Sequence, residues 1–243
     1  MKLSIIIVHY RTPELLKLCL KRLGKYLGNI EHEIKIIDNS NNNIGFARGV
    51  NIGLCQTTGE YRLILNPDAL ITEGAVQKML AYMDKHEDIG MIGPQLKYFN
   101  NEHQRSYHRF YRPITIIARR TFLGKMLKGI LDKFLMNDTD PNRIQTPDWI
   151  LGAAMLVRSS AIDKVGLMDE RFFLYFEDVD WCRRFWHNGY KLIYFPDAVF
   201  YHYYPRLSTA FNRTALWHIT SAVKYFWKYR NLQNLSSASS SLR

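Results

Sequence analysis

Cysteine is scarce in this chain. Its three copies, Cys19, Cys55 and Cys182, are odd in number and lie far apart in a sequence of 243 residues. Their spacing matches neither a disulfide framework nor a zinc site. Because proteins without disulfides are typical of reducing compartments, we expect a cytoplasmic location.

Long apolar runs are also absent. A membrane-spanning helix needs about 20 predominantly apolar residues, and no segment of the sequence comes close to this length. The first residues lead straight into the apolar run Leu3–Val8, which is too short for a secretory signal and lacks a cleavage site. We therefore expect a protein that does not cross a membrane, although it can lie on the surface of one.

Acidic residues are too few to balance the basic ones. The chain has 33 Lys and Arg against 22 Asp and Glu, which gives a formal net charge of +11. Such an excess indicates an anionic partner: a nucleic acid, a phosphorylated substrate or an acidic membrane surface. With 47% hydrophobic and 23% charged residues, the composition is otherwise that of an ordinary folded protein with one large domain or two small ones.

Short apolar runs alternate with helical patterns in the first hundred residues. Strands are expected at Leu3–Val8, Glu33–Asp38, Tyr61–Asn66 and Gly90–Lys97. Helices are expected between them, at about residues 13–23, 44–56 and 73–86. Strands that alternate with helices at this spacing predict a doubly wound, mostly parallel α/β sheet.

Two of these strands finish in an aspartate, Asp38 and Asp68. Pro67 ends the third strand because proline has no N–H to donate to a sheet. The carboxyl ends of parallel strands meet at one edge, where α/β sheets bind ligands. Aspartate is also common in turns, but two aspartates at one edge favour a shared ligand. We expect Asp68 to hold a metal ion, which in turn holds a nucleoside diphosphate.

Three carboxylates fall within four residues at Glu177, Asp178 and Asp180, among several aromatic residues. Acids in the first turn of a helix interact favourably with its dipole, which is one explanation. Burial among aromatic rings is costly for a carboxylate, however, and it raises the pKa and makes the group a better base. We expect one of the three to be catalytic, with Arg183 and Arg184 available to pair with the others.

A glycine-rich segment, residues 43–51, places Gly45, Arg48 and Asn51 around the start of a helix. It lacks the spacing of a dinucleotide fingerprint but suits contact with an anion or a ribose. An ordinary glycine-rich turn is the alternative. Later in the chain, Gly152 and Ala153 are small enough to let a ligand or another backbone come close.

The middle and the end of the chain are basic and amphipathic. Apolar pairs recur every four residues over Phe122–Leu135, with Lys125, Lys128 and Lys133 between them. This pattern is typical both of a helix on a membrane surface and of a helix packed on its own core, and both interpretations stay open. A last helix is expected at about Thr214–Arg230. Its expected apolar side consists of Leu216, Ile219, Val223, Phe226 and Trp227.

Several motifs, taken in order, resemble those of the bacterial family-2 glycosyltransferases, particularly the branch that includes rhamnosyltransferases of surface-polysaccharide assembly. The resemblance covers nearly all of residues 3–230, and His202 falls where such enzymes keep a histidine near the metal. The matching segments are Ile5–Tyr10, Ile36–Ser40, Asn43–Asn51, Leu65–Asp68, Gly152–Leu156, Gly166–Phe173 and Phe176–Asp180.

The resemblance implies a GT-A-like α/β fold: a doubly wound, mostly parallel sheet with an acceptor-side subregion and a C-terminal helix. Residues 1–98 are then the half that binds the nucleotide sugar, and residues 99–147 are a basic amphipathic insertion. Residues 148–231 are the half that binds the acceptor and carries catalysis. Residues 232–243, rich in serine, are expected to be a disordered tail.

The resemblance also implies a reaction: inverting transfer of a sugar, with rhamnose as a candidate, from a dTDP- or UDP-linked donor to a polysaccharide or lipid-linked acceptor. A Mg²⁺ or Mn²⁺ ion is expected on Asp68 and His202, although a lone histidine is more often structural. Asp178 is the expected base, with Glu177 beside it. The expected donor-binding residues are His9, Tyr10, Asp38, Asn39, Gly45, Arg48, Asn51, Asn66 and Asp68. The expected acceptor-side residues are Gly152, Ala153, Asp180 and Arg183, the last two as a supporting pair.

Three departures from the family pattern bear on the donor. Arg11 replaces a usual asparagine, Tyr203-Tyr204-Pro205 replaces a glycine-rich turn, and Asn66 replaces an acid, which leaves the metal to Asp68 and the diphosphate. Basic segments at Arg119–Lys133 and Lys224–Arg230 suit a peripheral position at the inner face of the cell membrane.

Two other hypotheses follow from the same residues. One is a nucleic-acid-binding protein, suggested by the net charge and by Arg105–Arg112. It leaves Asp38, Asp68 and the carboxylate cluster unexplained, because these groups repel phosphates without a metal, and we expect no nucleic acid to bind. The other is an inactive module that only binds nucleotide sugars, against which the intact Glu177-Asp178 pair argues.

Overall fold

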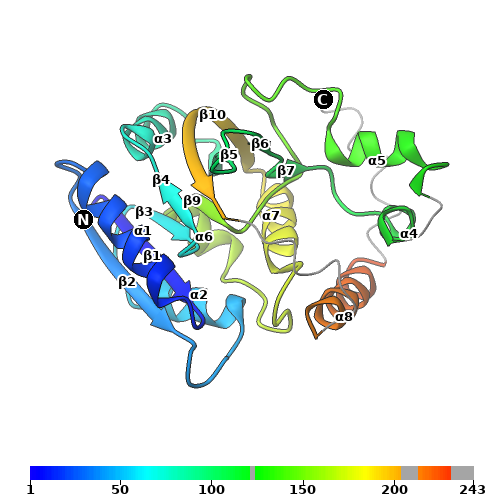
Figure 1. Cartoon of the computed structure of the whole chain (residues 1–243), viewed down its shortest axis with the longest axis horizontal. Coiled ribbons are helices and arrows are strands. Elements are labelled where there is room, and N and C mark those ends of the chain that lie inside the picture. Colours follow the sequence, from blue (N-terminus) through cyan, green and yellow to red (C-terminus); the bar gives the residue numbers. More distant parts are fainter. Residues whose placement is uncertain (121–123, 204–212, 231–243) are drawn as a thin grey trace.

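The computed structural model describes residues 1–120, 124–203 and 213–230, and Figure 1 shows a twisted sheet with helices on both faces. The strands are β1 (Leu3–His9), β2 (His32–Asp38), β3 (Tyr61–Leu65), β4 (Ala69–Ile71), β5 (Ile89–Lys97), β6 (His103–Gln104), β7 (Tyr107–His108), β8 (Trp149–Ile150), β9 (Ala154–Arg158) and β10 (Lys191–His202). The helices are α1 (Pro13–Tyr26), α2 (Phe46–Cys55), α3 (Ala75–Asp84), α4 (Pro113–Arg120), α5 (Lys128–Leu135), α6 (Ser159–Val165), α7 (Glu177–His187) and α8 (Arg213–Lys228).

The main sheet has the strand order β2-β1-β3-β9-β5-β10-β4, with β6 paired to β5. Strands β1, β2, β3, β5 and β10 run in one direction, whereas β4, β6 and β9 run antiparallel to their neighbours. The expected mostly parallel α/β sheet is therefore confirmed. Because β9 lies between β3 and β5, residues 1–98 and 148–231 share this sheet, and their division into a donor half and an acceptor half stays a functional prediction.

The hydrophobic core lies on both faces of the sheet. In β1, Ile5 and Ile7 pack with α1 and α3, while Ile6 and Val8 point to the opposite face and pack with α2 and α6. All seven residues of this strand are buried. Side chains of successive strand residues point to opposite faces, so a strand buried on both faces reads as one continuous apolar run. This explains why the short apolar run at the start of the sequence predicted the strand correctly.

Two stretches differ from the strands that their sequence predicts. The pattern of Trp149–Arg158 predicts one strand, but the structure divides it into β8 and β9, because residues 151–153 form a turn at the carboxyl edge of the sheet. Pro196 predicts a break between two short strands, Lys191–Phe195 and Ala198–His202, but β10 is continuous and its register shifts between Phe195 and Val199. A bulge leaves an N–H unpaired, so it accommodates a proline that a regular ladder rejects.

The middle of the chain does not form the expected single amphipathic helix. It forms two short helices, α4 and α5, and residues 121–123 lie outside the described ranges. Phe134 of α5 is buried and stacks on His108, with ring centroids 5.2 Å apart. The helix therefore packs at least partly on the protein's own core. In the described ranges, no helix is long and apolar enough to cross a membrane.

The apolar side expected for α8 is not the side that packs on the protein. The helix packs through Ala215, Ser221, Ala222 and Tyr225, which are all buried, as is Tyr229 just after its end. On the expected apolar side, Phe226 is partly buried and the other side chains are exposed. The Tyr225 and Tyr229 hydroxyls reach Arg183 and Asp180 of α7, polar contacts that a purely apolar pattern does not reveal. The expected tail at residues 232–243 lies outside the described residues.

Candidate active site

Asp68 and His202 are brought together by the sheet. Asp68 lies in a tight turn closed by a hydrogen bond from the Ala69 N–H to the Asn66 carbonyl, 3.0 Å long. His202 is the last residue of β10 and pairs with Ala69 across the β4–β10 ladder. As a result, Asp68 Oδ1 lies 3.5 Å from His202 Nε2. Two residues that are 134 positions apart in sequence meet at the carboxyl edge of the sheet, as the sequence predicted.

The surroundings of this pair suit a divalent cation. The His202 ring is buried and its Nδ1 lies 2.9 Å from Gln104 Oε1. When Nδ1–H donates to that oxygen, Nε2 presents its lone pair toward Asp68, whose Oδ1 is buried without a hydrogen-bond partner among the described residues. Carboxylate oxygen and neutral imidazole both bind Mn²⁺. In the part of the chain that the structure describes, no group of three or more His, Cys, Asp or Glu could hold a metal ion, and Asp68 and His202 are the two candidate ligands.

A cavity of about 650 Å³ opens beside the ends of β1 and β2. Its lining consists of His9, Arg11, Pro13, Leu16, Lys17, Leu20, Asp38 and Ser40. His9 Nε2 lies 3.1 Å from Asp38 Oδ1, and the Ser40 N–H donates to the same oxygen at 2.7 Å. Hydrogen bonds from Ser40 keep the pKa of Asp38 below its ordinary value. The cavity thus has an apolar wall with a charged carboxylate at one end. This arrangement suits a flat polar ring.

The two residues that follow β1, Tyr10 and Arg11, differ in their position relative to the cavity. Arg11 has a left-handed backbone, φ 55°, and its N–H donates to Ser40 Oγ at 3.1 Å. Its side chain lines the cavity, and its guanidinium carbon lies 5.2 Å from the centre of the Tyr10 ring. Tyr10 itself is half exposed and is outside the lining. The residue that departs from the family pattern therefore lies at the cavity, together with Lys17, which sequence reasoning missed.

Two of the three asparagines predicted to bind the donor have protein partners for their side chains. The buried Asn39 amide donates to the Gly45 carbonyl at 3.1 Å. The Asn51 amide both donates to the Met168 carbonyl and accepts from the Met168 N–H, each at 2.9 Å. These side chains hold the glycine-rich segment in place. Arg48 is exposed, and its Nε lies 3.9 Å from Glu170 Oε2.

Gly45 has a conformational reason to be glycine. Its φ is 89°, and a Cβ there would lie 2.8 Å from the Phe173 carbonyl oxygen. Any side chain at this position would therefore be strained and would also push the segment before α7 away. The glycine is explained by close packing of backbone, the alternative that the sequence left open.

Asp178 is buried at the start of α7, near the turn that carries Asp68. Its Oδ2 accepts the Gly152 N–H at 2.9 Å, and its Oδ1 accepts the Val179 N–H at 2.8 Å. The neighbouring Ala153 carbonyl accepts the Asn66 N–H at 2.9 Å. Gly152 and Ala153, two successive residues of one turn, therefore contact both carboxylate-bearing segments, and their expected role on the acceptor side stays a prediction.

Burial gives the carboxylates at the start of α7 unusual proton affinities. Removal from water raises the pKa of Asp178 to about 6. The pKa of Glu177 is raised well above its ordinary value, first by burial and then by the charge of Asp178. Both side chains are at least nine-tenths buried. A carboxylate with a pKa near neutrality is a suitable general base, because it is free of its proton at physiological pH and still attracts one.

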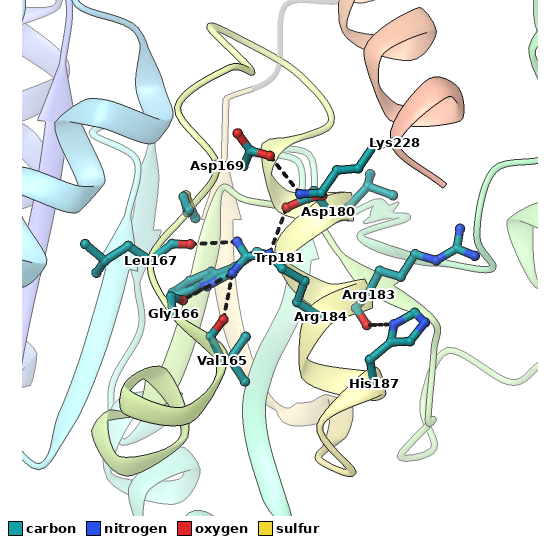
Figure 2. Close-up of polar contacts among 12 residues, drawn as sticks. Val165, Gly166, Leu167, Asp169, Asp180, Trp181, Arg183, Arg184, His187 and Lys228 are labelled. Carbon is teal, nitrogen blue, oxygen red and sulfur yellow. Dashed lines mark hydrogen bonds and ion pairs between the residues drawn. The ribbon is translucent and has the colours of Figure 1, made fainter. Parts of the chain in front are cut away.

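The third carboxylate, Asp180, belongs to a separate network (Figure 2). It is completely buried. Arg184 Nε lies 3.0 Å from its Oδ2, Lys228 Nζ lies 2.5 Å from its Oδ1, and the Tyr229 hydroxyl donates to Oδ1 at 2.8 Å. Lys228 also contacts Asp169 Oδ2 at 2.7 Å. This network ties α8 to α7 two residues after Asp178.

The predicted pair of Asp180 with Arg183 was wrong. Arg183 points toward the aromatic side chains of α8 instead: it donates to the Tyr225 hydroxyl at 3.0 Å and lies over the Tyr229 ring at 4.3 Å. Positions three and four apart on a helix are both neighbours of Asp180, so the sequence spacing alone did not select Arg184. Nothing in the sequence near Asp180 indicates its other two partners, Lys228 and Tyr229.

Comparison with known proteins adds an independent line of evidence. Residues 23–144, half of the chain, match the family described as "Glycosyl transferase family 2". The chain is 27% identical over 199 residues to rhamnosyltransferase WbbL of Escherichia coli K12, covering 78% of this chain and 73% of WbbL. It is 24% identical over 177 residues to the N-acetylglucosaminyl-diphospho-decaprenol L-rhamnosyltransferase of Mycobacterium tuberculosis, covering 66% of this chain and 56% of that protein.

Among solved structures, GalNAc-T7 with UDP, GalNAc and Mn²⁺ superposes with a TM-score of 0.62 at 13% identity. The match covers 87% of this chain and 44% of GalNAc-T7. At this identity the likeness concerns the fold, which is GT-A-like. The chain thus spans less than two thirds of both the mycobacterial relative and GalNAc-T7.

Proposed function

Because this chain belongs to glycosyl transferase family 2, we propose that it is an inverting glycosyltransferase. It moves a sugar, rhamnose being our candidate, from a dTDP- or UDP-linked donor to a saccharide or lipid-linked acceptor. The observation that carries the proposal is the turn at Gly152 and Ala153. The Gly152 N–H donates to Asp178, a buried carboxylate with a raised pKa. The Ala153 carbonyl accepts the N–H of Asn66, two residues before Asp68 of the Asp68–His202 pair.

The donor's base would lie in the cavity that His9 and Asp38 help to line. Asp38 stays charged and accepts N–H groups, and the imino N–H of uracil or thymine is a donor of this kind. Arg11 and Lys17 at the same cavity supply positive charge for phosphates. The GalNAc-T7 structure contains UDP, and the relatives' names specify rhamnosyl transfer.

A Mg²⁺ or Mn²⁺ ion fits Asp68 and His202, and when bound it would neutralise the charge that develops on the departing diphosphate. The protein's own residues would do the rest. The Gly152 and Val179 N–H groups hold Asp178 in one orientation. Asp178 would take the proton of the acceptor hydroxyl as its oxygen attacks the anomeric carbon from the face opposite the diphosphate. Burial, and then the charge of Asp178, raise the pKa of Glu177, the carboxyl next to the proposed base.

The first prediction concerns pH. Below its pKa of about 6, Asp178 carries a proton and cannot accept another. The kcat/KM for transfer is therefore expected to rise about tenfold per pH unit below about pH 6 and to level off above it. Nucleotide release, measured from about pH 4.5 to 8, tests this expectation. A profile without an acidic limb would contradict the assignment of this carboxylate as the base.

The second prediction tests the donor and the metal together. UDP, dTDP and GDP are added in turn, with and without Mn²⁺, and the melting temperature is recorded. Either UDP or dTDP, at about 100 times its Kd, should raise the melting temperature by about 5–10 °C. Asp68→Asn should abolish most of the Mn²⁺-dependent part of this rise in melting temperature, because it removes the carboxylate of the Asp68–His202 pair.

Asp88→Asn is the matched control for this experiment. Asp88 is an exposed carboxylate whose Oδ2 lies 2.7 Å from Lys191 Nζ. Its loss should change stability by less than about 1 kcal/mol and leave the nucleotide effect intact. If no nucleotide stabilises the wild-type chain, the donor proposal is wrong. If Asp68→Asn keeps the full Mn²⁺ effect, the proposed metal position is wrong.

The acceptor and its location complete the proposal. The mycobacterial relative is named for an acceptor carried on decaprenol, which suggests a lipid-linked acceptor here as well. The formal charge of +11 suits a cytoplasmic leaflet with anionic lipids. We therefore place the protein in the cytoplasm, peripheral to the inner face of the cell membrane.

A further inference from the structure

Helix α8 has one face that packs on nothing in the described structure. Four apolar side chains, here called the α8 stripe, line this face: Leu216, Ile219, Val223 and Trp227. Their exposed fractions are 60%, 42%, 63% and 63%. Their spacing of three or four residues puts them on one side of the helix. Contiguous exposed apolar surface of this kind marks a site of interaction with a protein or a membrane.

The exposure of the stripe is not a sign of a loosely attached helix. The opposite face is anchored by Tyr225, which is fully buried, and by the network of Lys228 with Asp180 and Asp169 (Figure 2). The Ser221 hydroxyl also donates to the Leu174 carbonyl at 2.9 Å. Figure 1 shows α8 at the periphery, on the side of α4 and α7 and away from β1 and β2. The helix is therefore held firmly and presents the stripe outward.

The charges around the stripe select the kind of surface it fits. Helix α8 contains no acidic residue. Lys224 is exposed beside the stripe, and the Arg230 guanidinium lies over the Trp227 ring, 4.5 Å from its centre. If two copies packed stripe to stripe, these cations would be brought toward each other. An anionic lipid surface would instead satisfy both the apolar side chains and the cations around them.

We propose that the α8 stripe lies in the interfacial layer of a membrane leaflet that contains anionic lipids. A helix of this length extends over about 24 Å, at about 1.5 Å per residue, and it would lie in the plane of the interface. Trp227 is the kind of side chain that is enriched at the boundary between headgroups and acyl chains. The stripe, rather than the α4–α5 segment, would make the apolar contact with lipid.

The inference deepens the proposed function and rests on it for the meaning of the contact. Helix α8 covers the segment that leads into the catalytic helix: Trp217 packs on Phe173, with ring centroids 5.0 Å apart. Asp178 follows five residues after Phe173, so the lipid surface and the proposed base are joined by a short packed connection. This arrangement would present the site to an acceptor whose lipid part stays in the membrane.

The third prediction measures lipid binding directly, without donor or acceptor. The full chain is sedimented with vesicles of phosphatidylcholine alone, or of phosphatidylcholine and phosphatidylglycerol in equal parts, at low salt. It should bind the anionic vesicles and not the neutral ones. Val223→Ser and Trp227→Ser should each weaken binding about tenfold, because each removes an apolar side chain from the interface. Both positions are exposed, so the variants should fold normally.

Two matched variants control for apolar exposure elsewhere. Leu18→Ser removes a 38% exposed leucine from α1, and Met126→Ser removes an 81% exposed methionine near α5. Both should bind vesicles as the wild type does. Failure of the wild type to bind anionic vesicles, or a loss with Met126→Ser as large as with Val223→Ser, overturns the proposal. A dimer of the wild-type chain that dissociates in the stripe variants also overturns the proposal.

The outcome can be separated from that of the donor proposal. The stripe variants should keep the thermal stabilisation by nucleotide and Mn²⁺, because none of the four side chains lines the cavity. Nucleotide stabilisation without lipid binding would overturn only the assignment of the stripe. Lipid binding without nucleotide stabilisation would overturn only the donor.

Discussion

Replacing Asp178 with asparagine is expected to lower the kcat for sugar transfer by about 10²–10⁴-fold, the usual contribution of a general base. The substitution keeps the shape of the side chain but removes its ability to accept a proton. The Gly152 and Val179 N–H groups bond to different oxygens of Asp178, so the single oxygen of asparagine keeps one of these two hydrogen bonds. The melting-temperature shift caused by nucleotide should remain, because Asp178 does not line the donor cavity.

Glu177→Gln is the informative comparison for this variant. Glu177 is equally buried but has no N–H partner for its Oε2 among the described residues. If Asp178 is the base, the glutamine variant should retain much more activity than the asparagine variant. The reverse order would make Glu177 the base. Equal loss of transfer and of nucleotide stabilisation in Asp178→Asn would show that this carboxylate supports the fold instead.

The parts of the site that lie on strand ends could be predicted from the sequence. Asp38 and Asp68 each follow a buried apolar run, and parallel strands necessarily bring their carboxyl ends to one edge. The acid cluster at the start of α7 was also visible, because carboxylates among aromatic residues predict both burial and a raised pKa. These signals are local in sequence, and each is read from a few neighbouring residues.

What the sequence did not show depends on contacts between distant segments. The antiparallel strand β9 enters the middle of the sheet, and the pattern of a buried strand is the same in either direction. Asn39 and Asn51 looked like ligands, yet their amides bond to the protein's own backbone. The bulge around Pro196 likewise depends on β5, with which β10 pairs.

Helix α8 shows the same limit most clearly. Its sequence has large apolar side chains on one side and alanines, a serine and a tyrosine on another. Hydrophobic periodicity by itself would choose the first side as the buried one. The structure buries the second side, where Lys228, and Tyr229 just after the helix, contact the buried carboxylate of Asp180 on α7. The pairing of this buried carboxylate outweighed the apolar pattern of the helix, and the α8 stripe is therefore exposed.

Replacing Asp180 with asparagine is expected to have the largest effect on stability, lowering the free energy of unfolding by about 3 kcal/mol. The carboxylate is completely buried and contacts Arg184, Lys228 and Tyr229. Without its charge, two cations remain in a partly buried place, and Lys228 keeps only Asp169. Denaturant unfolding at pH 7 measures the change. Arg143→Gln is the control: its exposed ion pair with Asp140 should be worth less than about 1 kcal/mol.

A double variant decides whether the loss arises from the ion pair itself. Lys228→Met alone leaves Asp180 with Arg184 and Tyr229, and it should also be destabilising. When both Asp180 and Lys228 are replaced, no carboxylate is left facing a lost cation, so the combined loss should be smaller than the sum of the single losses by about 1 kcal/mol or more. Additive losses would mean that the two residues stabilise the protein independently. Coupling would show that α8, with its exposed stripe, is held to the catalytic helix by charge.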